Sequence, residues 1–371
     1  MNTDLSPHLV SAQCVLTCEE LDPTLSFFTE TLGFRVDTIH PADHPTVAVV
    51  SGHGIRIRLE RSQEPANARI RLLCRDRDAL TARTGGQTSL TAPNGTRIEL
   101  ADAEPPVVVP KAEQSLVVSR YHDESAWSVG RAGMLYRDLI PDRLGGAFIA
   151  SHIRIPNGGP VPDYVHFHKI HFQMIYSYRG WARLVYEDQG EPFLLKAGDC
   201  VLQPPQIRHR VLECSDGMEV VEIGCPAEHE TFADHEMTLP TETLAPEREF
   251  GGQRFVRHHA ERARFTPFRI AGLEARDIGI GDGTHGLAGV MVVRRAGDAI
   301  DTKRWEHDRE FLFYFVLEGS LDLSVGPTTE KLASGDTFVL PAGASCAFNA
   351  CSDDMELLEV SLPALAAAPG K

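Results

Sequence analysis

Residues 159–213 read GPVPDYVHFHKIHFQMIYSYRGWARLVYEDQGEPFLLKAGDCVLQPPQIRHRVLE. His166 and His168 are one residue apart, so on a β-strand both side chains project to the same face. The apolar run that follows ends at a glycine, which predicts a second strand and a tight turn that bring Gln173 beside the two histidines. A third strand, stopped by two prolines, delivers His209 to the same interior. Three imidazoles and one side-chain amide oxygen are therefore predicted to converge.

The spacing of these residues resembles that of the cupins, small β-barrels with two sequence motifs. The first motif runs from a glycine through HxH and a glutamate to a second glycine, and the second runs from a glycine through PxG to a histidine. The matching residues here are, in order, Gly159, His166, His168, Gln173, Gly180, Gly198, Pro204 and His209. Two positions depart from the family, because Gln173 replaces the glutamate and Gln206 replaces the glycine of PxG.

The resemblance implies a mainly β fold and one divalent metal ion bound by His166, His168, Gln173 and His209. Fe(II) is the metal we expect, with Mn, Ni, Zn or Cu as alternatives. The competing interpretation is that these are ordinary core or surface histidines. His171 falls in the turn between the first two strands, and we expect it to support the site rather than to bind the metal.

Five residues are candidates for acting on a bound substrate. Tyr164 and His171 are the candidate general bases. Arg154, Arg208 and Arg210 are the candidate substrate-binding cations, since each lies on or beside a predicted strand of the barrel. An outward-facing, solvated side chain is the alternative for Arg154. Strand alternation puts Arg208 and Arg210 on the face opposite the metal-binding histidine, so outward salt bridges are their alternative role.

The composition of the whole chain bounds its function. The chain has 371 residues, which predicts two or three domains, and its 42% hydrophobic and 24% charged residues are those of a soluble globular protein. A formal charge of -16 argues against a nucleic-acid partner, because it repels a phosphate backbone. The sequence has neither a leader-peptide pattern nor an apolar run of membrane-spanning length, so we expect a cytoplasmic protein without membrane contact. Eight cysteines without a CxxC pair fit reduced thiols.

The first domain is expected over residues 1–104. Its pattern is a strand, a helix and three strands, followed by a shorter copy of the same arrangement. The segment LDPTLSFFTETLGFRV at residues 21–36 resembles the vicinal-oxygen-chelate superfamily, which includes glyoxalase I and extradiol dioxygenases. The resemblance implies a small, glyoxalase-like α+β domain.

In that superfamily the first and last strands of each module supply metal ligands. The matching positions are Gln13 and Glu60 in the first copy and Arg69 and Glu99 in the second. Because the cation of Arg69 is unfavourable beside a divalent metal, we expect a scaffold or substrate-shielding domain instead of a metal site.

Two cupin barrels are expected after this domain: residues 115–240, which carry the metal motif, and residues 265–365. A proline-rich linker at 104–114 and a polar connector at 241–264 precede them. In the second barrel the ligand positions hold Trp305, His307, Leu312 and Cys346. One histidine remains of three, and a set made of one His, Glu310 and one Cys matches a hard-metal site poorly. We therefore expect this barrel to hold no metal and to serve in packing.

The function has to be inferred from the residues of the site, because barrels of this fold catalyse many different reactions. Neutral imidazoles and at most an amide oxygen leave the charge of the metal uncompensated, which favours an anionic chelating substrate. Three-histidine cupin sites of this kind occur in gentisate, diketone and thiol dioxygenases. We therefore expect a mononuclear dioxygenase that acts with O2 on a small anionic enolic or phenolic compound.

Two other classes stay open. An isomerase or lyase needs the same metal only as a Lewis acid and consumes no oxygen. A non-enzymatic, ligand-binding cupin is the second alternative. The shortness of the first domain also suggests a homodimer.

Overall fold

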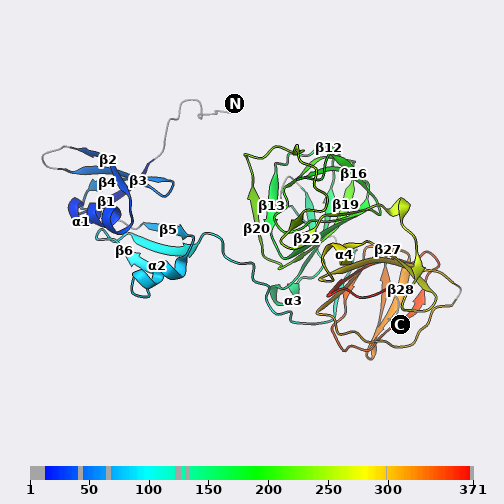
Figure 1. The fold of residues 1–371 in the computed structure, drawn as a ribbon. Coiled ribbons are helices and arrows are strands. Elements are labelled where there is room, and N and C mark those ends of the chain that lie inside the picture. Colours follow the sequence, from blue (N-terminus) through cyan, green and yellow to red (C-terminus); the bar gives the residue numbers. More distant parts are fainter. Residues whose placement is uncertain are drawn as a thin grey trace. The chain divides into compact units, whose positions relative to one another are not determined.

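The computed structural model describes residues 13–40, 45–63, 68–121, 127–129, 134–297 and 299–367. The chain divides into two compact units, Met1–Pro106 and Val107–Lys371 (Figure 1). Residues 1–12, where no leader peptide is expected, lie outside the described residues. Among the described helices, none is long and apolar enough to cross a membrane.

The first unit contains two modules of similar topology. The first module runs through β1 (Cys14–Cys18), α1 (Leu21–Ser26), the π-helical turn η2 (Phe27–Thr31), β2 (Arg35–His40), β3 (Val47–Gly52) and β4 (Ile55–Arg61). Its sheet has the order β1-β4-β3-β2, with β1 parallel to β4. Gly33 follows the helical segment with a φ of 72°, a conformation that glycine adopts without steric cost. The expected order of one strand, one helix and three strands is observed.

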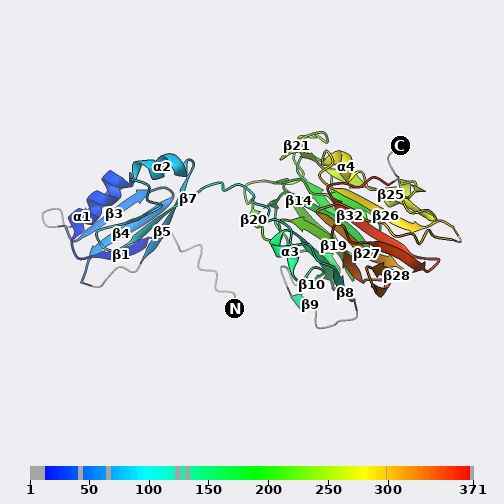
Figure 2. The same ribbon diagram turned by 90° about the horizontal axis from the view of Figure 1, so that it is seen from below.

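The second module is shorter. It consists of β5 (Arg69–Cys74), α2 (Arg77–Arg83), β6 (Ser89–Thr91) and β7 (Arg97–Asp102), with the sheet order β5-β7-β6 and β5 parallel to β7 (Figure 2). Asp76 caps α2, since its carboxylate accepts the N–H of Ala79 at 2.8 Å. Phe28 and Ile57 of the first module and Ile98 of the second are fully buried in one shared core. The unit is therefore α+β, as the sequence predicts.

The first barrel of the second unit is built from two sheets. The larger sheet, in the order β23-β17-β14-β19-β11-β10-β9, contains β9 (Trp127–Val129), β10 (Leu135–Asp138), β11 (Ile149–Ile155), β14 (Phe172–Arg179), β17 (Cys200–Leu202), β19 (Met218–Cys225) and β23 (Val256–His258). The smaller sheet, in the order β16-β15-β18-β13-β20, contains β13 (His166–Lys169), β15 (Trp181–Tyr186), β16 (Phe193–Lys196), β18 (His209–Cys214) and β20 (Glu230–Ala233), and β12 (Gly159–Pro160) pairs with β18. The predicted turn at Gly180 joins β14 to β15 with a φ of 73°.

The second barrel repeats this plan. Its larger sheet, in the order β24-β25-β26-β32-β27-β30-β8, contains β8 (Val117–Ser119), β24 (Thr266–Pro267), β25 (Leu273–Asp277), β26 (Gly289–Arg295), β27 (Phe311–Glu318), β30 (Thr337–Val339) and β32 (Glu356–Leu362). Its smaller sheet, in the order β29-β28-β31, contains β28 (Ser320–Val325), β29 (Thr328–Ala333) and β31 (Cys346–Cys351). Gly319 turns from β27 to β28 with a φ of 67°, as Gly180 does in the first barrel.

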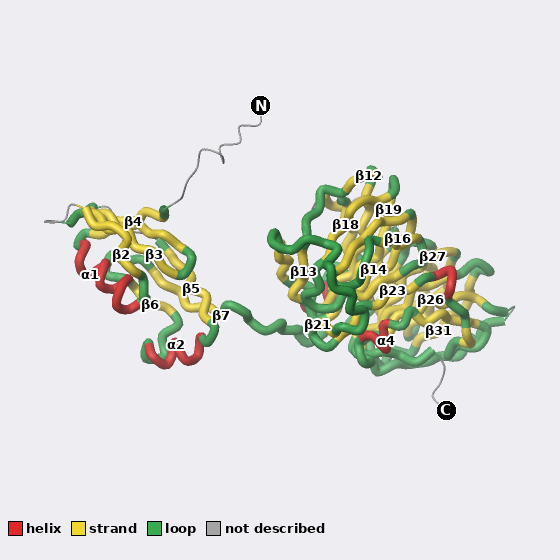
Figure 3. Tube along the Cα trace, turned by 45° about the horizontal axis from the view of Figure 1, so that its top comes forward, coloured by secondary structure: helices red, strands yellow, loops and turns green. Residues whose placement is uncertain are grey.

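The second unit also has a few short elements outside the four sheets described above. The short elements are α3 (Arg143–Gly146), β21 (Glu249–Phe250), β22 (Gln253–Arg254), the 3-10 turn η5 (Ala260–Arg262) and α4 (Ile280–Gly283). Figure 3 shows strands as the dominant element, with only brief helical turns between them. The mainly β architecture follows the prediction.

The two larger sheets share one hydrophobic core. Buried side chains of β14 and β19 pack with those of β27 and β32, and Phe148 stacks on Phe311 with ring centroids 4.2 Å apart. A fully buried side chain of this size stabilises the folded state by about 1.5–3 kcal/mol. The second barrel therefore covers one wall of the first.

The predicted barrel boundaries differ from the structure in two places. β8, at the start of the predicted 115–240 barrel, pairs with β30 of the second barrel. β23, inside the predicted connector 241–264, pairs with β17 of the first barrel. Both strands are three residues long, too short for a periodic pattern, and their partners lie far away in the sequence.

Candidate metal centre

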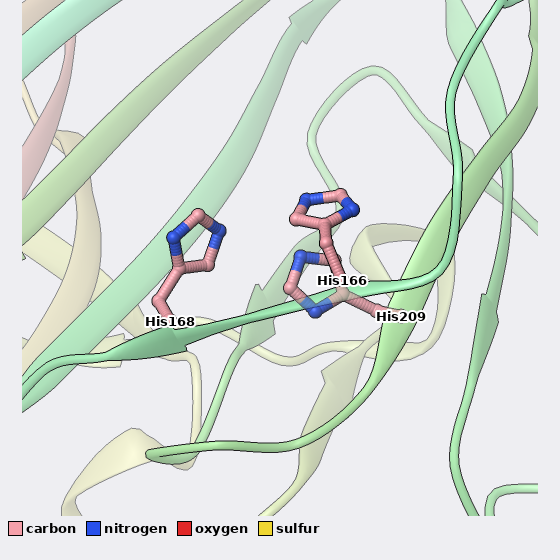
Figure 4. Close-up of side chains that lie close together, drawn as sticks. All are labelled: His166, His168 and His209. Carbon is pink, nitrogen blue, oxygen red and sulfur yellow. The ribbon is translucent and has the colours of Figure 1, made fainter. Parts of the chain in front are cut away.

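Three histidines meet inside the first barrel. His166 and His168 lie on β13, and His209, at the start of β18, is directly opposite His166 in the pairing of the two strands. One ring nitrogen from each lies within 4.8 Å of the others. Figure 4 shows the rings grouped on one side of the two strands. As predicted from side-chain alternation along a strand, His166 and His168 of β13 lie on the same face, and His209 joins them there.

The Nδ1 atom of each imidazole is engaged by a neighbouring group. Nδ1 of His166 donates to the carbonyl oxygen of Tyr164 at 2.8 Å, and Nδ1 of His209 donates to that of Ile207 at 3.0 Å. Nδ1 of His168 lies 2.9 Å from Oγ1 of Thr231. A hydrogen bond at one ring nitrogen fixes which tautomer is present and which nitrogen can bind a metal. The three Nε2 atoms are thus the candidate ligands.

The histidines open onto a cavity of about 320 Å³. Its apolar lining consists of Met134, Ile153, Ile155, Ile175, Ala182, Leu184, Leu195, Val211, Met218 and Val220, and its polar lining of Tyr136, His166, His168, Gln173, Gln203, His209, Glu222, His229 and Thr231. A small, mostly apolar pocket with a few convergent polar groups is the usual form of a small-molecule site.

Gln173, the fourth predicted ligand, lines the same cavity and is 2% exposed. Its Nε2 donates to Oε1 of Glu222 on β19 at 2.7 Å. Glu222 was not predicted, although Met218 and Val220 on the same strand also line the cavity. Alternation along MEVVEIGC therefore places an acidic residue on an apolar inner face, and this signal was available in the sequence.

Gln203 is a second residue that sequence reasoning missed. It is 2% exposed, and its Oε1 accepts a hydrogen bond from the hydroxyl of Tyr186 at 2.5 Å. Tyr186 stacks against the ring of His209. Burial raises the pKa of Tyr186 well above its usual value, with a smaller contribution from the charge of Glu222. The phenol therefore keeps its proton and holds the amide in one orientation.

Neither predicted general base lines this cavity. Tyr164 is 43% exposed; its carbonyl oxygen accepts the Nδ1–H of His166, and its ring lies edge-on to that imidazole with centroids 5.9 Å apart. His171 lines a different cavity, beside Lys111 and Glu310. The strand turns between His168 and Phe172, so His171 leaves the face that carries the other histidines.

The three predicted substrate-binding arginines also lie outside the lining of the cavity. Arg154 donates to Glu219 at 3.2 Å and to the hydroxyl of Tyr121 at 2.7 Å. Arg208 donates to Asp234 at 3.1 Å, and Arg210 lies on β18 between two residues that face the cavity. Alternation sends Arg210 to the other face of the strand. The salt-bridge alternative given for Arg208 and Arg210 describes Arg208.

The interior of the second barrel contains an ion pair beside its apolar core. The guanidinium of Arg269 donates to both carboxylate oxygens of Glu359, which also accepts from Tyr314 at 2.6 Å. The histidine at a ligand position, His307, donates through Nε2 to the carbonyl oxygen of Leu340 at 3.1 Å and accepts the N–H of Arg309 through Nδ1. Both of its ring nitrogens are thus used by the protein, and Leu312 is fully buried.

The predicted ligand positions of the first unit are engaged in ion pairs. Glu60 pairs with Arg58, and Glu99 with Arg71 at 3.2 Å. The hydrogen bond from Arg71 lowers the pKa of Glu99. Arg69 lies 3.7 Å from Glu99, and Gln13 is exposed ahead of β1. Within the described residues, the only group of metal-ligating side chains is the histidine triad of the first barrel.

Comparisons with known proteins identify the fold. No family model matches the chain, and no curated protein matches it either. Many solved structures do match the chain, and three of them are described here. Oxalate decarboxylase of Lactobacillus farciminis has a TM-score of 0.51 at 14% identity, over 68% of this chain and 87% of its own. Salicylate 1,2-dioxygenase of Pseudaminobacter salicylatoxidans has a TM-score of 0.50 at 17% identity, over 69% and 86%. The E. coli protein YlbA has a TM-score of 0.50 at 12% identity, over 69% and 93%.

These neighbours are two-barrel cupins. The second unit has the two-barrel cupin fold. At such identities the likeness concerns the fold, so the chemistry has to be argued from the residues of the cavity.

Proposed function

We propose that the protein is a metal-dependent cupin dioxygenase that acts on a small anionic enolic or phenolic compound, with Fe(II) as the metal. The observation that carries the proposal is the grouping of His166, His168 and His209 around one mostly apolar cavity. Three imidazole nitrogens suit the divalent ions of the late first transition row, Fe(II) included.

The triad fits a metal because its Nδ1 atoms are engaged and its Nε2 atoms are not needed for those bonds. Gln173 adds an amide oxygen at the same cavity. A metal held there would supply Lewis acidity and, if it is redox-active, electrons for dioxygen. The apolar side chains of the walls keep bulk water from the reacting groups, which strengthens every electrostatic interaction in the cavity.

Glu222 gives the cavity a group that can take up a proton. An enol or a phenol loses its hydroxyl proton when it binds as an anion, and the carboxylate of Glu222 is the acidic side chain that lines the cavity. Gln173 holds Oε1 of this carboxylate, so Oε2 is the atom that would accept the proton.

A Lewis-acid lyase or isomerase is the second candidate. The same carboxylate can move a proton between two positions of a substrate without any use of oxygen. One fold neighbour, oxalate decarboxylase, is a lyase by its name, and another is a dioxygenase. The two reaction classes therefore have equal support from the fold.

An oxygen-electrode experiment separates these candidates. Iron-reconstituted protein would be screened against enolic, catecholic and hydroxy-acid compounds, beside an anaerobic control. We expect oxygen uptake that depends on one substrate class and on the metal. Turnover that proceeds equally well without oxygen would exclude the dioxygenase and leave the Lewis-acid reaction.

The first unit is proposed to be a vicinal-oxygen-chelate-like scaffold without a metal of its own. Its βαβββ and βαββ modules support the likeness. The ion pairs at Glu60 and Glu99 support the proposal that this unit binds no metal. The incomplete second module supports the proposal of a homodimer, which the mass in solution would test.

A further inference from the structure

The first unit contains a cleft of about 600 Å³ that the proposed function does not use. Its walls come from the end of η2, the turn between β3 and β4, the β5-β7-β6 sheet and helix α2, all within the first unit. The positions that match the superfamily's metal ligands, Gln13, Glu60, Arg69 and Glu99, do not line it. The volume is that of an ordinary small-molecule site.

The apolar part of this cleft is aliphatic. Leu72 of β5 and Leu100 of β7 line it together with Leu32 and Ile55 of the first module, and none of its described lining residues is Phe, Tyr or Trp. Leu73, which also lines the cleft, is 66% exposed. An apolar molecule in the cleft would remove this leucine from water, which is favourable.

The charged part of the lining is mostly cationic. Arg71, Arg75 and Arg83 line the cleft, and Asp76 is the only carboxylate among its described lining residues. Arg71 is paired with Glu99 at 3.2 Å, and Asp76 caps α2. Arg75 and Arg83 have neither an ion pair nor a side-chain hydrogen bond within the described residues. Two guanidinium groups beside an aliphatic wall are therefore uncommitted.

These features complement one kind of molecule. A guanidinium keeps its charge at every ordinary pH, and its forked N–H groups match the oxygen atoms of an anionic group. The formal charge of the whole chain is -16, so two uncommitted cations at one aliphatic cleft are a local exception. A ligand with an anionic end and an apolar body would satisfy both parts of the lining.

We propose that the cleft of the first unit binds an amphipathic monoanion, such as a medium-chain carboxylate, with its charged end toward Arg75 and Arg83 and its chain against the leucines. Arg75 precedes α2 and Arg83 ends it, so the helix lies between the two cations. This binding site is independent of the metal centre in the first barrel.

Calorimetric titration of the full chain, without added metal, tests the proposal. The probes are hexanoate, octanoate and decanoate, and we expect each pair of added carbons to tighten binding by roughly tenfold, because each buried CH2 contributes about 0.8 kcal/mol. Decyl sulfate, a monoanion with another head group, should bind as well. Decylammonium, with the same chain and the opposite charge, should not.

Variants assign the binding to this cleft, since the cavity of the first barrel is also mostly apolar. The Arg75→Gln, Arg83→Gln double variant should weaken decanoate binding by at least about tenfold and leave the binding of decan-1-ol unchanged. Ala79→Phe, at an exposed position of α2 that lines the cleft, should weaken both. Arg61→Gln is the matched control, because Arg61 is exposed at the end of β4 and does not line the cleft.

Three results would overturn the proposal. They are decanoate binding that the double variant leaves unchanged, decylammonium binding as tight as that of decanoate, and no binding of any of the anions. Circular dichroism establishes that each variant is folded. The mass in solution is measured beside it, and a change of mass in Ala79→Phe would make the cleft a contact between two copies of the chain instead of a ligand site.

Discussion

His166 and His209 face each other across paired strands, and each is held by a backbone carbonyl two residues earlier in the chain. A backbone acceptor cannot be removed by substitution of a side chain. The orientation of these two rings is therefore built into the strands, whereas that of His168 depends on Thr231. Second contacts of this kind typically contribute 10- to 100-fold to metal affinity.

Removal of two histidines should abolish metal binding. The His166→Ala, His209→Ala double variant is expected to fall from about one divalent ion per chain to near zero, because one imidazole cannot hold a divalent ion tightly. Elemental analysis measures the content, and the surface variant His235→Ala is the control. Unchanged metal content in the double variant would contradict the assignment of the site.

Gln173→Glu should tighten metal binding and weaken the binding of an anionic substrate. The new carboxylate adds a negative donor but lies against Glu222, whose Oε1 now accepts the Gln173 amide. Like charges at this distance repel in the metal-free protein. We expect a lower melting temperature without metal, a larger rise on adding metal, and about tenfold tighter metal binding, about 1.4 kcal/mol.

Scanning calorimetry with and without Zn2+ checks the melting temperatures and the metal affinity in this prediction. Gln173→Leu, which adds no charge, is the matched variant. If the metal affinity of Gln173→Glu equalled that of the wild type, Gln173 would be a wall residue rather than a ligand.

Some residues of the site could be predicted from the sequence and others could not, for a physical reason. His166, His168 and Gln173 lie within eight positions of each other, so strand alternation and one turn are sufficient to bring them together. Glu222 reaches Gln173 only because β19 pairs with β14 in a particular register. Register between distant strands depends on packing of the whole barrel, which local patterns do not encode.

At the level of elements, the two barrels share their turns and differ in what fills them. A side chain at Gly180 would meet Oγ of Ser215 at 2.3 Å, and one at Gly319 would meet Oγ of Ser352 at 2.3 Å. Both serine hydroxyls accept the N–H of the residue after the glycine. The interior of the first barrel opens onto a cavity beside its histidines, and that of the second contains Arg269 and Glu359.

Removing one partner of the ion pair in the second barrel should lower the stability of the protein strongly, whereas replacing both partners should lower it little. Arg269→Met leaves the buried carboxylate of Glu359 without its partner, and we expect a loss of about 3–5 kcal/mol of stability. The double variant Arg269→Met, Glu359→Met removes both charges and should recover most of this loss. Chemical denaturation measures the difference, and a double variant no more stable than the single one would contradict the explanation.

The strand boundaries show a second limit of sequence patterns. The apolar strand β14 was predicted from the run that ends at Gly180, and the structure contains it. The three-residue strands β8 and β23 were assigned to the wrong barrel or to a connector, because each is stabilised by a partner strand rather than by its own periodicity.

At the scale of the whole molecule, acid should destabilise the second unit. Burial lowers the pKa of His152, His258 and His307, although Glu219 opposes the shift at His152 and the carbonyl of Leu340 opposes it at His307. A histidine in the unfolded chain takes up a proton near pH 6.5. Below that pH the unfolded state binds more protons than the folded state, so stability falls as the pH falls.

We therefore expect a lower melting temperature at pH 5.5 than at pH 7.5. Scanning calorimetry of metal-free protein measures this, since a bound metal would add its own dependence on pH. His258→Gln should make the decline shallower, because one buried imidazole no longer contributes. A melting temperature that does not change over this range would contradict the prediction.

The exchange of edge strands between the barrels also sets an order of events during synthesis. Val117 of β8 pairs with Val339 of β30, and a ribosome adds the second residue roughly 10–40 s after the first at common elongation rates. The first barrel obtains β23 much sooner, because β17 waits only for residues 256–258. The metal-binding half of the protein can thus be complete while β8, which precedes it in the chain, is still unpaired. A nascent chain stopped at residue 240 lacks one edge strand of the first barrel and carries another that belongs to a barrel not yet made.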